Sequence, residues 1–326
     1  MTRLRFAIVG TNFISDRFVC AVRETECAEV VAVYSRKLDT GRLFADKYGI
    51  NKVYDDYSLM LADAEIDAVY VASPTFCHAE QTESALLSGK HALVEKMICT
   101  EADELRGLRR IAEERDLVLL EAMRPDFDPA YTVLRASLSR IGKIRRATLE
   151  FCQYSSRYDK FKSGEVLNAF DPKIKNSALA DIGIYPLHTA MMLFGAPRSM
   201  SAHSVFLHNG FEGAGNITLD YGDALCHVVY SKISDSVNPS VIEGECGSVI
   251  INKISAPTRI DLIPRTGEAE TVFTTELENN MVFEVESFVA MTRGEVSAER
   301  YLDASIESLL AVEEAYRQTG ARAKME

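Results

Sequence analysis

The stretch Arg5-Phe-Ala-Ile-Val-Gly-Thr-Asn-Phe-Ile-Ser-Asp-Arg-Phe-Val-Cys20, near the start of the 326-residue chain, decides the fold class. A short apolar run from Phe6 to Val9 stops at Gly10, and a helical pattern begins within three residues. At such a turn the backbone can approach a ligand closely, and the helix N-terminus presents unpaired N–H groups. The stretch therefore predicts a strand–turn–helix unit whose turn can hold an anionic group.

Apolar runs alternate with helical patterns as far as Glu121. Strands that are almost entirely apolar are buried on both faces, which indicates a parallel sheet covered by helices. The pattern predicts a doubly wound α/β (Rossmann) domain over residues 1–122, in which ligands bind at the carboxyl ends of the strands. The predicted strands are 6–9, 30–34, 52–54, 68–72, 92–94 and 118–120, and the predicted helices are 14–24, 40–47, 58–62, 77–87 and 102–114.

The first turn is an altered form of the dinucleotide fingerprint G-x-G-x-x-G. Gly10 fills the first position, Asn12 the second and Ser15 the third. Asparagine tolerates positive φ better than most residues, and serine is small enough for close helix–strand packing. The turn alone is weak evidence for a dinucleotide, but the five further βα steps indicate a cofactor turn.

The ends of the other strands extend this expected cofactor site. Two cations in Ser35-Arg36-Lys37, after the second strand, suit a 2′-phosphate, so NADP(H) is favoured and NAD(H) is the alternative. The plain alternative is a solvated loop. The expected cofactor-binding residues are Gly10, Thr11, Asn12, Phe13 and Ile14, then Ser35, Arg36 and Lys37, then Ser73, Pro74, Thr75 and His78, and finally Glu95 and Lys96.

Two of these strand ends have structural alternatives. Ser73 or Thr75 could simply cap the following helix, with His78 assisting that cap. Glu95 and Lys96 could be an ordinary exposed ion pair of little consequence. We favour a functional role for Lys96, because at the mouth of the crevice a lysine can lie beside the nicotinamide and polarise a substrate oxygen.

From Lys143 onward the pattern changes to strand-like runs separated by short turns. Consecutive strands joined by tight turns form antiparallel sheets, so residues 123–326 are predicted to be an α+β domain with an open, mostly antiparallel sheet. Its C-terminal helix, 302–318, is a candidate to pack back near the first domain. The predicted strands are 144–153, 200–207, 217–221, 224–233, 241–245, 248–251, 259–263 and 271–275.

One helical segment, 177–194, carries three ionisable groups among apolar residues. Asp181, Tyr185 and His188 are spaced by four and three residues, which places them on one face of an α-helix. Each has a structural alternative: a helix N-terminal acid, a core aromatic and a satisfied core histidine. Together they favour a proton-handling cluster, and a metal site is a weaker option because no matching ligand spacing lies nearby.

Composition limits the class of protein. The chain is 47% hydrophobic and 26% charged, with a formal net charge of −12, which argues against nucleic acid as a partner. No apolar run is long enough to span a bilayer, and there is no room for a signal peptide before the first strand. The seven scattered cysteines include no C-x-x-C pair, so we expect reduced thiols in a cytoplasmic protein.

These residues together resemble the Gfo/Idh/MocA oxidoreductases, most of all the dimeric dihydrodiol dehydrogenase branch. The likeness rests on the 10–11 turn, on 73–75 with His78, on the run 89–96 and on the run 181–188. It implies hydride transfer between NAD(P) and a small sugar, polyol or diol, and a homodimer or larger assembly through the C-terminal sheet. Met97 replaces the proline of the family's Glu-Lys-Pro motif, and Asn176-Ser177 replaces two glycines.

The resemblance also implies roles for individual side chains. Lys96 matches the lysine beside the nicotinamide, Tyr185 matches the aromatic acid/base, and Asp181 matches the acid that orients the substrate or the proton donor. His188 belongs to the same catalytic set with a less defined role. The alternative to an enzyme is a catalytically silent NAD(P)-binding sensor of the same fold, which the changes at Asn12 and Met97 motivate.

Overall fold

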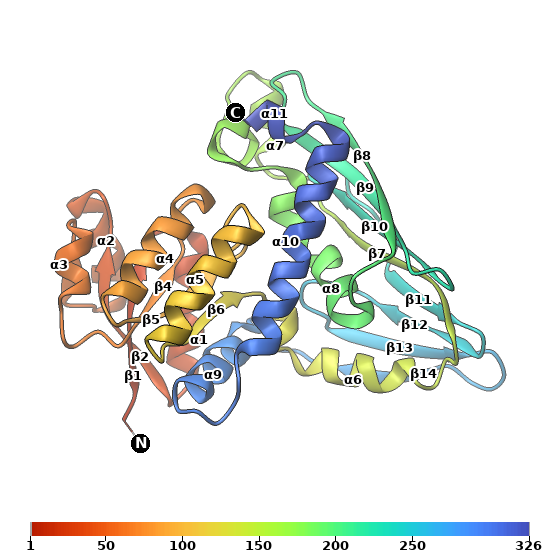
Figure 1. Ribbon diagram of the computed structural model, residues 1–326, viewed down its shortest axis with the longest axis horizontal. Coiled ribbons are helices and arrows are strands. Elements are labelled where there is room, and N and C mark those ends of the chain that lie inside the picture. The colour runs from red at the N-terminus through yellow and green to blue at the C-terminus, as the bar shows by residue number, and fades with distance from the viewer. Residues whose placement is uncertain (1, 326) are drawn as a thin grey trace. The chain divides into compact units, whose positions relative to one another are not determined.

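The computed structural model describes residues 2–325 and divides into two compact units (Figure 1). Unit 1 comprises residues 1–124 and 279–306, and unit 2 comprises residues 125–278 and 307–326. The segment 279–306, which we predicted in the second domain, thus clusters with the first. The reason is aromatic packing: Phe288 of this segment lies 5.6 Å from Phe6 of the first strand, ring centroid to ring centroid. The C-terminal helix is divided between the units after Ile306.

The sheet of unit 1 has six parallel strands in the order β3-β2-β1-β4-β5-β6. This order reverses direction between β1 and β4, which confirms the predicted doubly wound domain. The strands are β1 (Leu4–Val9), β2 (Ala28–Tyr34), β3 (Lys52–Tyr54), β4 (Ala68–Val71), β5 (His91–Glu95) and β6 (Leu119–Ala122).

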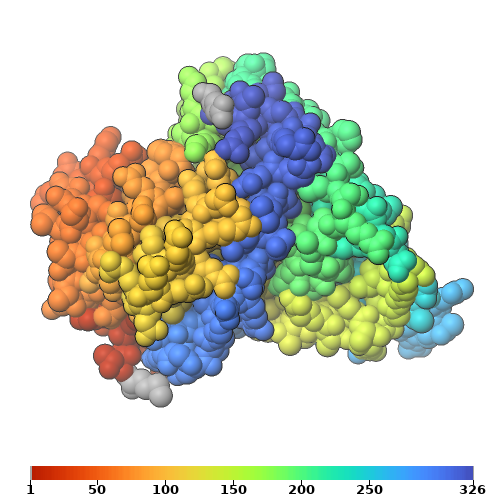
Figure 2. Space-filling model, in the orientation of Figure 1, coloured from red at the N-terminus to blue at the C-terminus, as the bar shows by residue number. Residues whose placement is uncertain are grey.

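Helices cover both faces of this sheet, as its apolar strands require. In Figures 1 and 2, α4 and α5 lie over the face turned to the viewer, and the other face packs against α1 and α9. The helices of unit 1 are α1 (Phe13–Glu24), α2 (Leu38–Tyr48), α3 (Tyr57–Leu61), α4 (His78–Leu87), α5 (Ala102–Glu114) and α9 (Met281–Thr292). The sequence analysis missed α9.

Unit 2 is built on an eight-stranded sheet in the order β14-β13-β12-β11-β7-β10-β9-β8. All neighbouring pairs are antiparallel except β7 and β10, which run parallel, so the predicted mostly antiparallel sheet is confirmed. The strands are β7 (Ile144–Cys152), β8 (Ser199–Phe206), β9 (Glu212–Asp220), β10 (Leu225–Ser231), β11 (Ser240–Gly244), β12 (Gly247–Ile251), β13 (Arg259–Pro264) and β14 (Glu270–Thr274).

The helices of unit 2 include one feature that the sequence pattern did not predict. A π-helix, Leu179–Gly183, runs directly into α8, so the predicted α-helix over 177–194 is in fact two kinds of helix. The α-helices are α6 (Pro129–Leu138), α7 (Tyr158–Lys162), α8 (Ile184–Phe194) and α11 (Arg322–Met325), and α10 (Glu299–Thr319) begins in unit 1. Single-turn π segments are frequent at functional sites.

Within residues 2–325, no helix combines the length and the apolar character that crossing a membrane requires. The seven cysteines form no disulfide with one another.

Candidate functional site

The turn after β1 requires glycine at its first position. Gly10 has φ of +109°, and a Cβ atom there would lie 2.7 Å from the carbonyl oxygen of Ala72. Positive φ is costly for residues with a side chain, and the short distance leaves no room for one. Gly10 therefore lets the ends of β1 and β4 approach each other at the edge where the sheet order reverses.

Asn12 does not make use of the tolerance of positive φ for which asparagine was noted. Its φ is −92°, and its side chain caps α1 instead. The amide oxygen accepts hydrogen bonds from the backbone N–H groups of Ile14 (2.8 Å) and Ser15 (3.3 Å). The amide nitrogen donates to the carbonyl of Ala72 at 2.6 Å. Asparagine thus joins α1 to the end of β4, which a glycine could not do.

This cap leaves part of the anion-binding capacity of the turn in place. Among the described residues, the backbone N–H groups of Thr11, Asn12 and Phe13 have no hydrogen-bond partner. Phe13 is 66% exposed, so the turn is open to solvent. Unpaired N–H groups at a helix N-terminus are the usual binding site of a pyrophosphate.

The end of β2 presents two exposed cations. Arg36 and Lys37 make no side-chain hydrogen bond or ion pair with any residue in the range that the structure describes. Burial raises the pKa of Tyr34, and the positive charge of Arg36 partly opposes this shift. The Arg36 guanidinium therefore lies near the Tyr34 phenol. Some surface cations of this unit, such as Lys47 and Lys52, are instead paired with acids. The unpaired cations at 36 and 37 are therefore available to a phosphate.

His78 holds the ends of β4 and β5 together. Its ring is buried, and its two nitrogens lie 2.8 Å from the carbonyl oxygens of Ser73 and Met97. Burial lowers the pKa of this histidine. The Ser73 hydroxyl donates to the side chain of Gln81 at 2.6 Å, and neither Ser73 nor Thr75 caps α4. His78 therefore shapes the loops that follow Pro74 and Lys96 without facing solvent.

Glu95 is a buried acid and not half of an exposed pair. It accepts a hydrogen bond from the Tyr70 hydroxyl at 2.5 Å and, more weakly, from the backbone N–H of Lys96 at 3.3 Å. Lys96 itself is half-buried, directly after β5. A carboxylate inside the domain thus contacts the Lys96 backbone.

Two further acids of unit 1, which the sequence analysis missed, are buried. Glu121, in β6, accepts hydrogen bonds from the backbone N–H of Ile98 (2.9 Å) and from the Ser305 hydroxyl (2.5 Å). Glu284, in α9, is completely buried, and its carboxyl oxygens have no hydrogen-bond partner among the described residues. In the sequence, the only sign of this buried acid was its place inside the largely apolar run Met281–Thr292.

In unit 2, Asp181 lies within the π-helix and keeps 39% of its side chain exposed. It forms an ion pair of 2.8 Å with Lys232, whose side chain is only 4% exposed. Sequence reasoning missed Lys232, because nothing local marks the partner of a distant acid. The only available signal was a lysine directly after the alternating strand β10.

His188 and Tyr185 lie in α8 with partners of their own. His188 is completely buried, with one ring nitrogen 2.9 Å from the Ser308 hydroxyl and the other 3.0 Å from an oxygen of Asp126. Tyr185 is 5% exposed and its ring lies 5.8 Å from that of Phe151. The π-helix breaks the α-helical spacing on which we placed the three residues on one face, and Asp181 is the most exposed of them.

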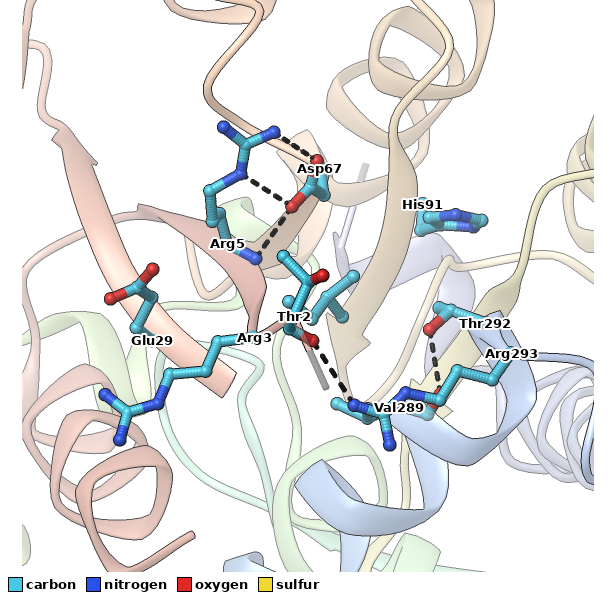
Figure 3. Close-up of a pocket in the computed structure, with 10 residues that line it drawn as sticks. Thr2, Arg3, Arg5, Glu29, Asp67, His91, Val289, Thr292 and Arg293 are labelled. Carbon is cyan, nitrogen blue, oxygen red and sulfur yellow. Dashed lines mark hydrogen bonds and ion pairs between the residues drawn. The ribbon is translucent and has the colours of Figure 1, made fainter. Parts of the chain in front are cut away.

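Residues 2–325 contain no group of three His, Cys, Asp or Glu side chains that could hold a metal ion. A pocket of about 720 Å³ in unit 1 lies at the opposite edge of the sheet, where β1, β2, β4 and β5 begin (Figure 3). Its lining includes Arg3, His91 and Arg293, and Arg5, which Asp67 neutralises through a 2.7 Å ion pair. This pocket is therefore distinct from the carboxyl edge that carries the predicted cofactor residues.

Comparison with known families agrees with this architecture. Residues 4–123 match the family described as "Oxidoreductase family, NAD-binding Rossmann fold", and residues 137–250 match the GFO/IDH/MocA C-terminal domain. The chain belongs to the Gfo/Idh/MocA family of oxidoreductases. The predicted resemblance is thereby confirmed.

Similar members of the family are known in several organisms. The chain is 38% identical over 319 residues to the scyllo-inositol 2-dehydrogenase (NADP⁺) of Bacillus subtilis, covering 97% of each sequence. It is 29% identical over 264 residues to the trans-1,2-dihydrobenzene-1,2-diol dehydrogenase of Mus musculus, covering 79% of this chain and 77% of that one. Identity to the inositol dehydrogenase thus exceeds identity to the diol dehydrogenase branch that we had expected.

Solved structures share the fold. A 3-ketoreductase from Actinomadura kijaniata in complex with NADP and TDP-benzene superimposes with a TM-score of 0.87, covering 98% of each chain at 22% identity. At that identity the likeness concerns the fold alone.

Proposed function

We propose that this oxidoreductase is an NADP(H)-dependent dehydrogenase of a cyclitol, polyol or diol, with scyllo-inositol as the first substrate to test. The observation that carries the proposal is the pair of unpaired cations at the end of β2, next to a turn with free N–H groups. A 2′-phosphate needs such cations, and a pyrophosphate needs such a turn. The name of the Bacillus subtilis relative supports both the cofactor and the substrate class.

The residues of unit 1 fit the cofactor. The N–H groups of Thr11, Asn12 and Phe13 would bind the pyrophosphate, and Arg36 with Lys37 would bind the 2′-phosphate. When bound, NADP⁺ supplies the acceptor for hydride from the carbon that bears the substrate hydroxyl.

The proton of that hydroxyl needs an acceptor in the protein. We propose Tyr185 as the acid/base, with the ammonium of Lys96 stabilising the phenolate electrostatically. The proposal requires both side chains to reach the same substrate oxygen. Asp181, which is half-exposed and ionically held, would accept a hydrogen bond from a neighbouring substrate hydroxyl.

His188 has a different part in this proposal. Because its ring is completely buried between Asp126 and Ser308, it has no surface to offer a substrate. We assign it to holding α8, and with it Tyr185, in place. A homodimer or larger assembly through the eight-stranded sheet and a cytoplasmic location complete the proposal.

The decisive experiment replaces the proposed acid/base. Tyr185→Phe should bind NADP⁺ as tightly as the wild type and reduce kcat with scyllo-inositol by about 100-fold or more, which is the usual contribution of a positioned acid/base. The matched control is Tyr221→Phe, which removes a phenol whose hydroxyl donates to the Gly195 carbonyl in the same unit. Unchanged turnover in Tyr185→Phe would show that another group handles the proton.

A second outcome concerns the substrate and the silent-sensor alternative. The wild-type protein should reduce NADP⁺ with at least one compound of a panel of inositols, polyols, sugars and diols. Cofactor binding without turnover on the whole panel would contradict the proposed substrate class and favour a binding role.

A further inference from the structure

We propose that Lys232 is a positioning residue for catalysis, which acts on the substrate only through the Asp181 carboxylate. This inference rests on the proposed function, because it assumes that Asp181 accepts a hydrogen bond from a substrate hydroxyl. It adds a residue from a different strand, and it makes a specific claim about energetic coupling between two side chains.

The Lys232 ammonium is held in one place from several directions. Its Nζ donates to the carbonyl oxygen of Ala169 at 2.7 Å and pairs with Oδ2 of Asp181 at 2.8 Å. The same atom lies 5.1 Å and 5.2 Å from the ring centroids of Phe170 and Phe211. A lysine this deeply buried occurs almost only when it is paired, and the aromatic rings keep water away from the ammonium.

The ion pair is asymmetric, which is why it resembles a positioning device more than a structural bridge. Lys232 is 4% exposed, whereas Asp181 keeps 39% of its side chain exposed. A structural pair in the core would bury both partners. Here a buried, immobile cation fixes one oxygen of a carboxylate whose remainder faces outward.

The backbone that carries Asp181 is secured by other residues. The hydroxyl of Ser177, which also bonds to Tyr316 at 2.8 Å, accepts from the N–H of Ala180 at 3.0 Å. The buried carboxylate of Glu212 accepts from the N–H of Leu179 at 3.1 Å. The π-helix therefore does not depend on Lys232, and removing the ammonium should release the Asp181 side chain while the helix stays in place.

The test is a double-mutant cycle with scyllo-inositol and NADP⁺, using Lys232→Met, Asp181→Asn and the double variant. Lys232→Met and Asp181→Asn should each reduce kcat/KM by about 100-fold, the size expected when a positioning contact is lost. Adding Lys232→Met to Asp181→Asn should change kcat/KM by less than about threefold, because the two residues act as one unit. Lys253→Met, which removes an exposed lysine of the same unit, is the control.

Several outcomes would overturn the inference. Full additivity in the double variant would show that Lys232 affects activity through something other than Asp181, such as general stability. Should Lys232→Met not fold, Lys232→Gln keeps a donor for Ala169 without the charge, and near-wild-type kcat/KM in that variant would also refute the role.

A crystal structure of Lys232→Met tests the inference without any substrate. We expect the Asp181 carboxylate to move while the backbone of 179–183 stays in place, and an unmoved carboxylate would overturn the inference. Absence of wild-type turnover on scyllo-inositol would instead contradict the proposed substrate, and this structural result would still decide the role of Lys232.

Discussion

Replacing Glu284 with glutamine should stabilise the protein at neutral pH, although the substitution adds no contact. Glu284 is completely buried in α9, and neither carboxyl oxygen has a hydrogen-bond partner among the described residues. Burial raises the pKa of this carboxyl well above its usual value, and the nearby Glu95 raises it further, against the smaller opposing effects of Arg124 and Arg17. The group is therefore expected to hold its proton in the folded protein at pH 7.

The size of the effect follows from proton linkage. A carboxyl whose pKa is raised by folding favours the folded state fully at pH below the unfolded value, and this contribution is lost as the pH rises towards the folded value. The unfolded side chain titrates near 4.3, and each pH unit above that costs about 1.4 kcal/mol while the folded group stays protonated. At pH 7 keeping Glu284 protonated therefore lowers the free energy of unfolding by roughly 4 kcal/mol, and glutamine, which does not titrate, avoids this loss.

Glutamine at position 284 still buries an amide with no partner, which offsets part of this gain. We therefore expect Glu284→Gln to raise the free energy of unfolding by about 2–3 kcal/mol at pH 7. At pH 5 the gain should fall below about 1 kcal/mol. Urea unfolding followed by circular dichroism, at half-unit steps between pH 5 and 8, measures this difference.

The control is Glu286→Gln, which removes an exposed acid from the same helix and should leave stability unchanged within about 0.5 kcal/mol at every pH. A gain for Glu284→Gln that does not vary with pH would refute the linkage argument. Destabilisation at pH 7 would show that Glu284 is ionised and that Arg17 or Arg124 neutralises it.

Two further predictions concern the cofactor turn and the end of β2. Gly10→Ala should destabilise the protein by about 3 kcal/mol or more, because it places a Cβ 2.7 Å from a carbonyl oxygen at a residue whose φ is +109°. Its control is Gly107→Ala in α5, where a Cβ meets nothing within 4 Å. In the same urea titration, Gly107→Ala should stabilise the protein by up to about 1 kcal/mol. Arg36→Ala should raise the Kd for NADP⁺ by about tenfold and leave the Kd for NAD⁺ unchanged. Isothermal titration calorimetry measures both dissociation constants, with Arg110→Ala as the control. Equal weakening of binding for the two cofactors would contradict a 2′-phosphate contact.

Local pattern was sufficient for much of unit 1. The apolar strands, the glycine turn and the helix α5 (Ala102–Glu114) were predicted close to their observed bounds, because each is specified by neighbouring residues. The cation pair at 36 and 37 could also be found, since the end of a strand in a doubly wound sheet has a known place. Asn12 shows the limit of this reasoning: its cap on α1 is local, but its hydrogen bond to the Ala72 carbonyl, after another strand, has no signal in the neighbouring sequence.

Elements whose role depends on distant packing were not predicted. The helix α9 contacts α1 in unit 1 although it follows all the strands of unit 2, and a division of the chain by sequence order could not show this. The π-helix likewise leaves no simple periodic signal, so Asp181 and Tyr185 were given an α-helical spacing that the structure does not have.

The sequence by itself determined the fold class and the family. Periodicity and turn chemistry report which residues are buried, and they do so within short stretches of chain. Only the tertiary structure decided which buried charges are paired, because a partner can come from any element. Lys232 lies against Asp181 from the end of β10, and His188 is held between Asp126 and Ser308. Glu284, in α9, has no hydrogen-bond partner anywhere in residues 2–325.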